Sequence, residues 1–333
     1  MLVLGIETSC DETAAAVLAD GQKILSSVVA SQDQIHAPYG GVVPELASRR
    51  HVEVILPVLE KALGEAGVSL RDLGGIAVTQ GPGLVGSLLV GCSVAKALAY
   101  AHALPLVGVN HLEGHVFSAF LGEPKPAYPF LALVVSGGHT ALYLAREPLR
   151  YQLIGQTRDD AAGEAFDKVA KLLALGYPGG PMIELTARSG APNAIAFPMA
   201  QIADGAPDFS FSGIKTAVSL FVKRNAPLSE RMVADVAASF QATVVKMLTA
   251  KTVKAARSLG MKRIVLTGGV AANRTLRAAL QGEAEARGWE LYIPPPSLCT
   301  DNAAMIAAVG HVRLLAGERA PLTLNALPSM KLA

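Results

Sequence analysis

Short apolar runs and longer amphipathic segments follow one another in the same order twice along the chain. Each half begins with three apolar runs separated by polar turns, the pattern of a β-hairpin extended by a third strand. A helix, a strand, a glycine-containing loop, a second helix and a last strand follow in each half. The predicted segments are 2–6, 13–18, 24–30, 52–66, 76–79, 84–102 and 106–109 in the first half, and 130–135, 140–145, 151–154, 230–258, 264–267, 273–287 and 291–293 in the second.

This repetition predicts a duplicated α/β fold with two lobes, each a mixed sheet covered by helices, and a ligand cleft between them. We expect the first lobe at 1–108, completed by a C-terminal helix at about 301–333. The second lobe is expected at 109–300, with a helical insertion at about 160–226. A single doubly wound sheet is the alternative. It is disfavoured because hairpins at the start of each half do not fit simple βαβ winding.

Composition narrows the class of protein. Half of the 333 residues are hydrophobic and 17% are charged, which argues against disorder. Three widely spaced cysteines form no disulfide framework, and the first residues lack the basic region of a signal peptide. The most apolar stretch, 84–104, is interrupted by Gly86, Gly91 and Lys96, so we expect a buried helix there rather than a membrane span. We therefore expect a cytoplasmic protein.

Two glycine-rich turns are candidate anion sites. One is Ser136-Gly137-Gly138-His139-Thr140, and the other runs from Thr267 through Gly268-Gly269 to Asn273. Glycines leave backbone N–H groups accessible to a phosphate, and the second turn opens a predicted helix. Neither turn ends in the Gly-Lys-Ser/Thr of a P-loop. Either could be a simple tight turn, but the pair within a duplicated fold favours nucleotide binding.

Two histidines have the spacing of metal ligands. His111 and His115 lie at i and i+4 and would share one face of a helix. Glu113 is displaced from its place in the H-E-x-x-H motif, which disfavours a metallopeptidase. A pair of histidines without a metal is the alternative. A third ligand is needed, but spacing alone does not connect Asp301 with the histidines. By itself, Asp301 is also consistent with an N-cap of the last helix.

Several carboxylates are candidates for proton transfer or binding. Asp11 and Glu12 lie at the tip of the first predicted hairpin, and Asp160 and Asp167 follow the second. Each is also consistent with a helix cap or a solvated turn.

The duplicated plan resembles the actin, sugar kinase and chaperone ATPase superfamily, which has a ribonuclease H-like fold. In that superfamily, ATP phosphates are bound between two hairpin turns, and the adenosine lies against a Gly-Gly loop. Beyond this, motifs spread over nearly the whole chain resemble the TsaD (Gcp/KEOPS catalytic subunit) family. The matching segments are 5–13, 40–49, 81–84, 110–115, 135–140, 159–168, 177–181, 209–216, 268–273 and 300–302.

The resemblance implies transfer of a threonylcarbamoyl group from threonylcarbamoyl-AMP to the exocyclic amine of the adenosine 3′ of the anticodon, in tRNAs that read codons beginning with A. It implies one iron or zinc ion, and binding of ATP or other adenine nucleotides. The metal would be held by His111, His115 and Asp301. The implied substrate-binding residues are Val134, Val135, Ser136, Gly137, Gly138, Asp167, Gly180, Asn273 and Glu184, the last at a position where many members carry Asp.

The resemblance also implies partners besides tRNA: a TsaB-type paralogue, a TsaE-type ATPase and an upstream enzyme that makes the adenylate. The apolar helix at 84–102 suits a heterodimer contact, because Gly86, Gly91, Ala95 and Ala99 would let a second helix approach closely. Burial inside the chain itself is the alternative. We assign Asp11 or Glu12 as the general base. A small-molecule kinase of the same superfold and an inactive ATP-binding scaffold are the rival functions.

Overall fold

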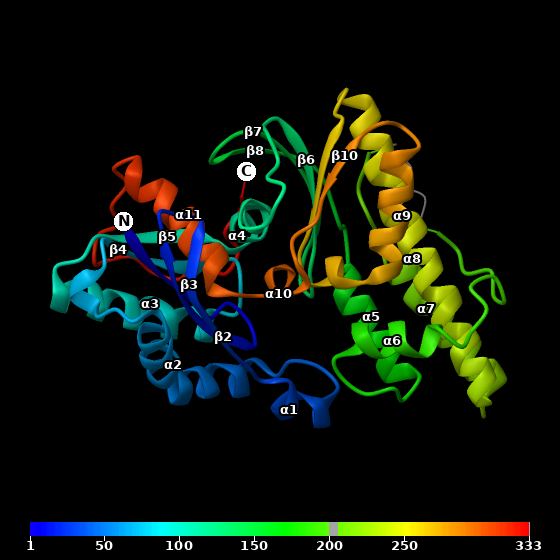
Figure 1. Ribbon diagram of the computed structural model, residues 1–333. Helices are drawn as coiled ribbons and strands as arrows, with labels where there is room; N and C mark the ends of the chain where they lie inside the picture. The colour runs from blue at the N-terminus through cyan, green and yellow to red at the C-terminus, as the bar shows by residue number, and fades with distance from the viewer. Residues whose placement is uncertain (200–205, 333) are drawn as a thin grey trace. The chain divides into compact units, whose positions relative to one another are not determined.

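The computed structural model describes residues 1–199 and 206–332, which form two compact units (Figure 1). Unit 1 comprises Met1–His36, Val42–Lys125 and Ser297–Leu332. Unit 2 comprises Ala37–Gly41 and the described residues of Pro126–Pro296. Residues 200–205, which belong to the predicted insertion, lie outside the described part of the chain.

Each unit contains a five-stranded mixed sheet, and the two sheets have the same topology. The strands of unit 1 are β1 (Leu2–Glu7), β2 (Glu12–Ala19), β3 (Lys23–Ser31), β4 (Gly75–Gly81) and β5 (Leu106–Asn110), in the order β3-β2-β1-β4-β5. Those of unit 2 are β6 (Phe130–Val135), β7 (Thr140–Glu147), β8 (Arg150–Gln156), β9 (Arg263–Thr267) and β10 (Glu290–Tyr292), in the order β8-β7-β6-β9-β10. In both sheets the first three strands are antiparallel neighbours, and the last two run parallel to the first. The predicted duplication is confirmed, and the single doubly wound sheet is wrong.

Helices complete both units. The α-helices are α1 (Asp33–His36), α2 (Pro44–Ala66), α3 (Val85–His102), α4 (His111–Phe117), α5 (Ala162–Leu172), α6 (Gly179–Ala187), α7 (Ser212–Asn225), α8 (Glu230–Ser258), α9 (Arg274–Glu285), α10 (Pro296–Cys299) and α11 (Ala303–Leu315). Short 3₁₀ turns are η1 (Ala37–Tyr39), η2 (Leu70–Asp72), η3 (Ser118–Phe120) and η4 (Gly269–Ala272). The prediction that α2 begins at Val52 is wrong. Its first two turns are mostly polar, so the apolar period begins later than the helix, which starts with Pro44 at a position that suits proline.

Alternation along β1 explains how helices cover both faces of the first sheet. Leu4 and Ile6 belong to the core cluster that includes residues of α2 and α3. Gly5 points the opposite way, toward α11, and a Cβ on Gly5 would lie 2.1 Å from the backbone oxygen of Ala303. Only glycine therefore lets α11 approach this strand so closely. The result is a sheet with α2 and α3 on one face and α11 on the other (Figure 1).

The helix α3 has one buried and one exposed face. By length and composition it is the one helix among the described residues that could cross a membrane, but it packs against α2 and β4. Gly91, Ala95 and Ala99 are buried in unit 1 itself. The expectation that these three residues receive a partner helix is therefore wrong. The exposed face instead carries Val85, Leu89, Ser93, Ala97 and Tyr100, and no charged residue.

Candidate metal centre and nucleotide site

The helix α4 presents both candidate histidines to one place in unit 1. Asn110 ends β5 and caps the helix, because its side-chain oxygen accepts the N–H groups of Leu112 and Glu113 at 2.9 and 3.3 Å. The helix therefore begins at His111, and His115 follows one turn later. The two imidazole rings are buried and lie edge to face with their centroids 4.6 Å apart.

Asp301, in the segment between α10 and α11, lies beside the two histidines. Its Oδ1 is 3.5 Å from Nε2 of His111 and 3.1 Å from Nε2 of His115. The alternative role of Asp301 as a helix cap is wrong, because Asn302 caps α11 by accepting the N–H of Met305 at 3.0 Å. One ligand atom from each of His111, His115 and Asp301 lies within 4.8 Å of the others. Two imidazole nitrogens and a carboxylate oxygen form a donor set that suits zinc or non-haem iron.

A second carboxylate, the buried Glu7, contacts this group, and no metal-ligand pattern in the sequence pointed to it. Its Oε2 lies 2.9 Å from Nδ1 of His111. Burial alone would lower the pKa of His111, but Asp301 and Glu7 outweigh this effect and raise that pKa to about 9. At His115 the effect of burial prevails over the neighbouring Asp301, and the pKa is lowered. The available signal for Glu7 was an acidic residue directly after the apolar run 2–6, and in the structure it is the last residue of β1.

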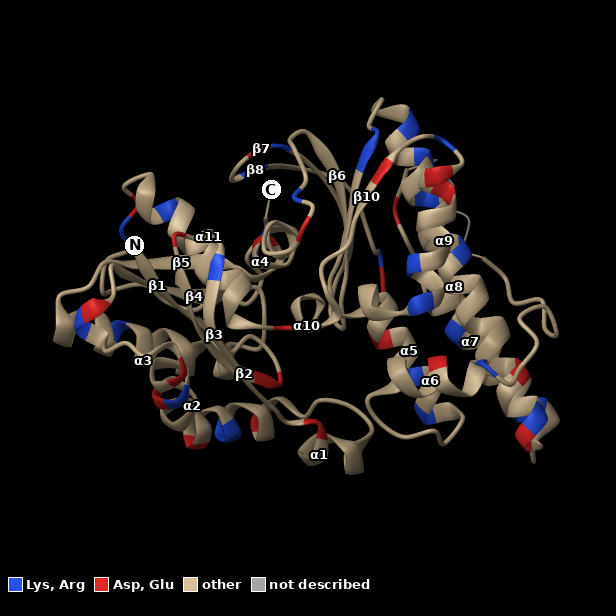
Figure 2. Ribbon diagram, viewed as in Figure 1, with Lys and Arg blue, Asp and Glu red and all other residues tan. Residues whose placement is uncertain are grey.

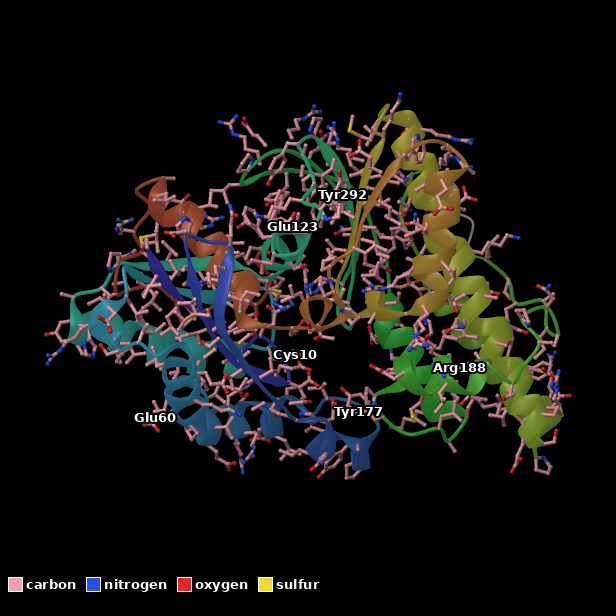
Figure 3. All side chains as sticks on the ribbon, viewed as in Figure 1. Cys10, Glu60, Glu123, Tyr177, Arg188 and Tyr292 are labelled. Atoms are coloured by element: carbon pink, nitrogen blue, oxygen red, sulfur yellow. The ribbon has the colours of Figure 1, made fainter. Side chains whose placement is uncertain are left out.

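Of the candidate bases, Asp11 lies in the turn between β1 and β2, next to Cys10, which Figure 3 labels, and Glu12 is the first residue of β2. One carboxylate oxygen from each of Asp11, Glu12 and Asp33 lies within 4.8 Å of the others. Burial raises the pKa of Glu12, and the negative charges of Asp301 and Asp11 raise it further. A carboxylate with a raised pKa is a stronger base than an ordinary glutamate and suits proton transfer near neutral pH.

The first glycine-rich turn connects β6 with β7 in unit 2. The N–H of Ser136 donates to the backbone oxygen of His139 at 2.8 Å and closes the turn. The start of α5 lies against it, because the N–H groups of Gly163 and Glu164 donate to the oxygens of Ser136 and Gly137 at 3.2 and 3.0 Å. A Cβ on Gly137 or Gly138 would meet no atom within 4 Å. The turn is therefore open on the side of these two glycines.

Val134 and Val135 differ from the rest of the predicted ligand segment. Both side chains are fully buried in the strand β6. Their side chains are therefore not accessible to a ligand. Val135 also sets the path of the second glycine loop, because Gly268 has φ +93° and a Cβ there would lie 2.4 Å from the backbone oxygen of Val135.

The other predicted nucleotide contacts are brought together by hydrogen bonds between helices of unit 2. Asp167 on α5 accepts the N–H of Gly179, directly before Gly180, at 2.8 Å. Glu184 on α6 accepts the N–H of Arg274 at 3.3 Å. Figure 3 labels Tyr177, which lies in the loop before α6. These bonds join α5, α6 and the start of α9.

Asn273 has a structural role in the same group. Its side-chain oxygen accepts the N–H of Leu276 at 3.0 Å and caps α9. Its amide nitrogen donates to Oε1 of Gln241 at 2.8 Å. A contact of Asn273, Asp167, Gly180 or Glu184 with a ligand stays a prediction.

The sequence matches a known family over most of its length. The family model of tRNA N6-adenosine threonylcarbamoyltransferase, TsaD, matches residues 23–308. A tRNA N6-adenosine threonylcarbamoyltransferase of Symbiobacterium thermophilum is 56% identical over 331 residues, which are 99% of this chain and 97% of that protein. One of Geobacter sp. (strain M21) is 57% identical over 328 residues, 98% of this chain and 96% of that protein.

Solved structures support the superfamily fold. Component A of (R)-2-hydroxyglutaryl-CoA dehydratase from Acidaminococcus fermentans superposes with a TM-score of 0.54 at 16% identity, covering 95% of this chain and 99% of that one. Full-length HypF in its phosphate- and nucleotide-bound form gives a TM-score of 0.60 at 14% identity, covering 94% of this chain and 46% of that one. At these identities the likeness shows the fold alone. The family match and the close relatives together show that this chain belongs to the TsaD family of tRNA N6-adenosine threonylcarbamoyltransferases, a family of transferases that modify tRNA.

Proposed function

We propose that this chain transfers a threonylcarbamoyl group from threonylcarbamoyl-AMP to the exocyclic amine of the adenosine 3′ of the anticodon, in tRNAs that read codons beginning with A. The observation that carries the proposal is the approach of His111, His115 and Asp301 from two distant segments of a chain in this family. The rival functions of a small-molecule kinase and a peptidase have no support in the comparisons. A metallopeptidase would need a glutamate close to the two histidines. The one nearest to them in sequence is Glu113, and it bonds to Arg313 at 2.7 Å.

An iron or zinc ion would be held by the two Nε2 atoms and the Asp301 carboxylate. When bound, such an ion stabilises negative charge on phosphate or carbonyl oxygens. The AMP part of the donor, or ATP, would bind at the open glycine turn. There the backbone N–H groups of Gly137 and Gly138 and the positive end of α5 favour an anion. Asp167, Gly180, Glu184 and Asn273 would complete the nucleotide site in unit 2.

Glu12 or Asp11 would accept the proton that the adenosine amine loses. An aryl amine is a weak nucleophile, so removal of its proton during attack on the carbamoyl carbon assists the reaction. The leaving group is AMP, which departs with the bonding electrons of the carbamoyl–phosphate bond. The raised pKa of Glu12 makes it the stronger candidate of the two.

A TsaB-type paralogue would bind the exposed apolar face of unit 1. Val52 and Leu56 on α2 are 65% and 57% exposed, and Val85 and Leu89 on α3 are 55% and 42% exposed. The two helices contact each other, and the ribbon of α3 in Figure 2 is almost entirely uncharged. Apolar side chains gathered on neighbouring helices are typical of a protein interface. A TsaE-type ATPase and an enzyme that makes the adenylate would act with this pair in the cytoplasm.

Transfer of the threonylcarbamoyl group, radiolabelled in its threonine part, from purified threonylcarbamoyl-AMP to unmodified tRNA tests the proposal. The chain is assayed with its partner proteins, so the donor-making enzyme is not needed. We expect Glu12→Gln to lower kcat by about 10²- to 10⁴-fold, the usual contribution of a general base. The exposed Glu60→Gln on α2 serves as the control. Absence of labelled tRNA with the wild-type chain would contradict the function. An unchanged kcat in Glu12→Gln would assign the base to Asp11.

A further inference from the structure

Glu7, the last residue of β1, is a buried carboxylate next to the proposed metal site, where it contacts His111. Its side chain is 1% exposed. The hydroxyl of Thr79 on β4 donates to Oε2 at 2.7 Å, and the N–H of Ser9 donates to Oε1. A buried carboxylate is tolerated when donors surround it, and here one donor comes from β4 and one from the turn that follows β1. Glu7 is therefore held in place independently of His111.

The hydrogen bond to His111 joins this fixed carboxylate to a candidate metal ligand. Oε2 of Glu7 lies 2.9 Å from Nδ1 of His111, on the side of the ring away from the nitrogen that faces Asp301. The hydroxyl of Ser9 lies 3.2 Å from the same Nδ1. The carboxylate is the closer acceptor and the charged one, so it is the main partner of Nδ1.

We propose that Glu7 is the positioning residue of the metal site: it accepts the Nδ1–H of His111 and so leaves the Nε2 lone pair directed at the ion. This inference rests on the proposed metal site at His111, His115 and Asp301. Glu7 itself is no ligand, because it contacts the opposite nitrogen of the ring. A carboxylate behind a ligating histidine fixes the tautomer and the ring orientation and increases the basicity of the nitrogen that binds the metal. The charge of Glu7 also offsets part of the charge of a divalent ion.

Metal affinity of the purified full chain tests this role without reference to activity. Zn²⁺ binding is measured by competition with a chromophoric chelator for the wild type, Glu7→Gln and Thr79→Val. We expect Glu7→Gln to weaken binding by about 10- to 100-fold, the usual effect of losing such a partner. Thr79→Val removes only the hydroxyl that holds Glu7, so a smaller loss is expected. With Co²⁺, the visible absorption bands of Glu7→Gln should keep the wild-type pattern, because the ligand set is unchanged.

Glu113→Gln is the matched control. Glu113 lies on α4 between the two histidines and its side chain is also 1% exposed, and its Oε2 accepts from Arg313 at 2.7 Å. Its replacement perturbs the same helix without touching Nδ1 of His111. We therefore expect less than an about threefold change in Zn²⁺ affinity, below the range for partners of a ligand. Urea unfolding of both variants compares their loss of stability.

The outcomes separate this inference from the function on which it rests. A wild-type chain without measurable Zn²⁺ or Co²⁺ binding would overturn the metal site, and the role of Glu7 with it. Tight binding by the wild type and an equal affinity in Glu7→Gln would overturn the role of Glu7 alone. Equal losses in Glu7→Gln and Glu113→Gln would also overturn it, since both would reflect a loosened helix. If Glu7→Gln fails to fold, the Zn²⁺ affinity of Thr79→Val tests the proposal instead. An affinity equal to that of the wild type would contradict it.

Discussion

Nε2 of His115 lies 3.1 Å from Oδ1 of Asp301, which joins α4 to the segment just before α11. The same two helices are connected a second time, because Arg313 on α11 donates to Glu113 on α4 at 2.7 Å. The close packing of Gly114 against Met305 and Ile306 adds a third contact. The elements that carry the candidate ligands are thus held together by groups that are not ligands. Removing one ligand should therefore leave the fold of unit 1 intact.

Replacing His115 with Ala should abolish metal binding. The change removes one of three donors, so the loss of affinity should exceed the about 10- to 100-fold that partners behind a ligand contribute. Transfer to tRNA should fall with it, while the circular dichroism spectrum stays that of the wild type. Elemental analysis of the purified protein measures the bound metal, and the exposed His102→Ala is the control. Full metal occupancy in His115→Ala would contradict the site.

Gly137→Val should weaken binding of adenine nucleotides at the β6–β7 turn. The space beyond Gly137 is open, so the valine would enter the volume proposed for a phosphate without striking the protein. We expect at least an about tenfold weaker Kd, equivalent to about 1.4 kcal/mol. Calorimetric titration with AMP or ATP measures it. Gly282→Val, at an open position on α9 in the same unit, should bind as the wild type does. Equal affinity in both variants would argue against a phosphate at this turn.

Leu89→Arg should disrupt the heterodimer with a TsaB-type paralogue. A charged side chain on the exposed apolar face of α3 would have to be desolvated in an apolar interface. Size-exclusion chromatography with light scattering should show the two chains eluting separately, and steady-state modification should fall. Nucleotide binding by the isolated chain should be unchanged. Leu220→Arg on α7 is a fair control, because Leu220 is 47% exposed and Leu89 is 42% exposed. An intact heterodimer in Leu89→Arg would exclude this face.

Asp160→Asn should change how the stability of unit 2 depends on pH. Partial burial would raise the pKa of Asp160, but hydrogen bonds from Lys215 and Lys168 outweigh it and lower that pKa. A carboxylate with a lowered pKa stabilises the folded state above its unfolded pKa of about 3.9, and this contribution is lost as the pH falls through the folded value. The difference in unfolding free energy between wild type and variant should therefore be constant near neutral pH and shrink below about pH 4.

Trp289, the chain's one tryptophan, lies in unit 2. Its fluorescence therefore reports the unfolding of unit 2 in urea. The solvent-exposed pair of Arg150 and Glu147 supplies the control, because Glu147→Gln should change stability little at any pH. A difference for Asp160→Asn that is the same at pH 3 and pH 7 would show that the carboxylate charge is not responsible.

Much of the architecture was predictable because local patterns of apolar and polar residues determine the strands and turns. Apolar runs of strand length around polar turns predicted the ten strands β1 to β10 of the described residues, and their recurrence predicted the duplication. The ends of α2 show the limit of this reasoning. Its C-terminus at Ala66 carries a local signal, the capping residue Gly67 with φ +65°, but its N-terminus lies in polar residues without an apolar period. Local chemistry also could not choose between Asp301 and Asn302 as the cap of α11, since both side chains suit that position.

The sequence by itself determined the duplicated fold and the histidine pair, because strand period, turn chemistry and i, i+4 spacing act between near neighbours in the chain. Only the tertiary structure decided that Asp301 and Glu7 meet these histidines. Glu7 reaches His111 because β1 and β5 flank β4 in one sheet, and Asp301 reaches it because α11 packs on the face of that sheet where Gly5 leaves room. Contacts of this kind depend on sheet order and helix packing, which join residues far apart in the chain and leave no periodic trace in a single sequence.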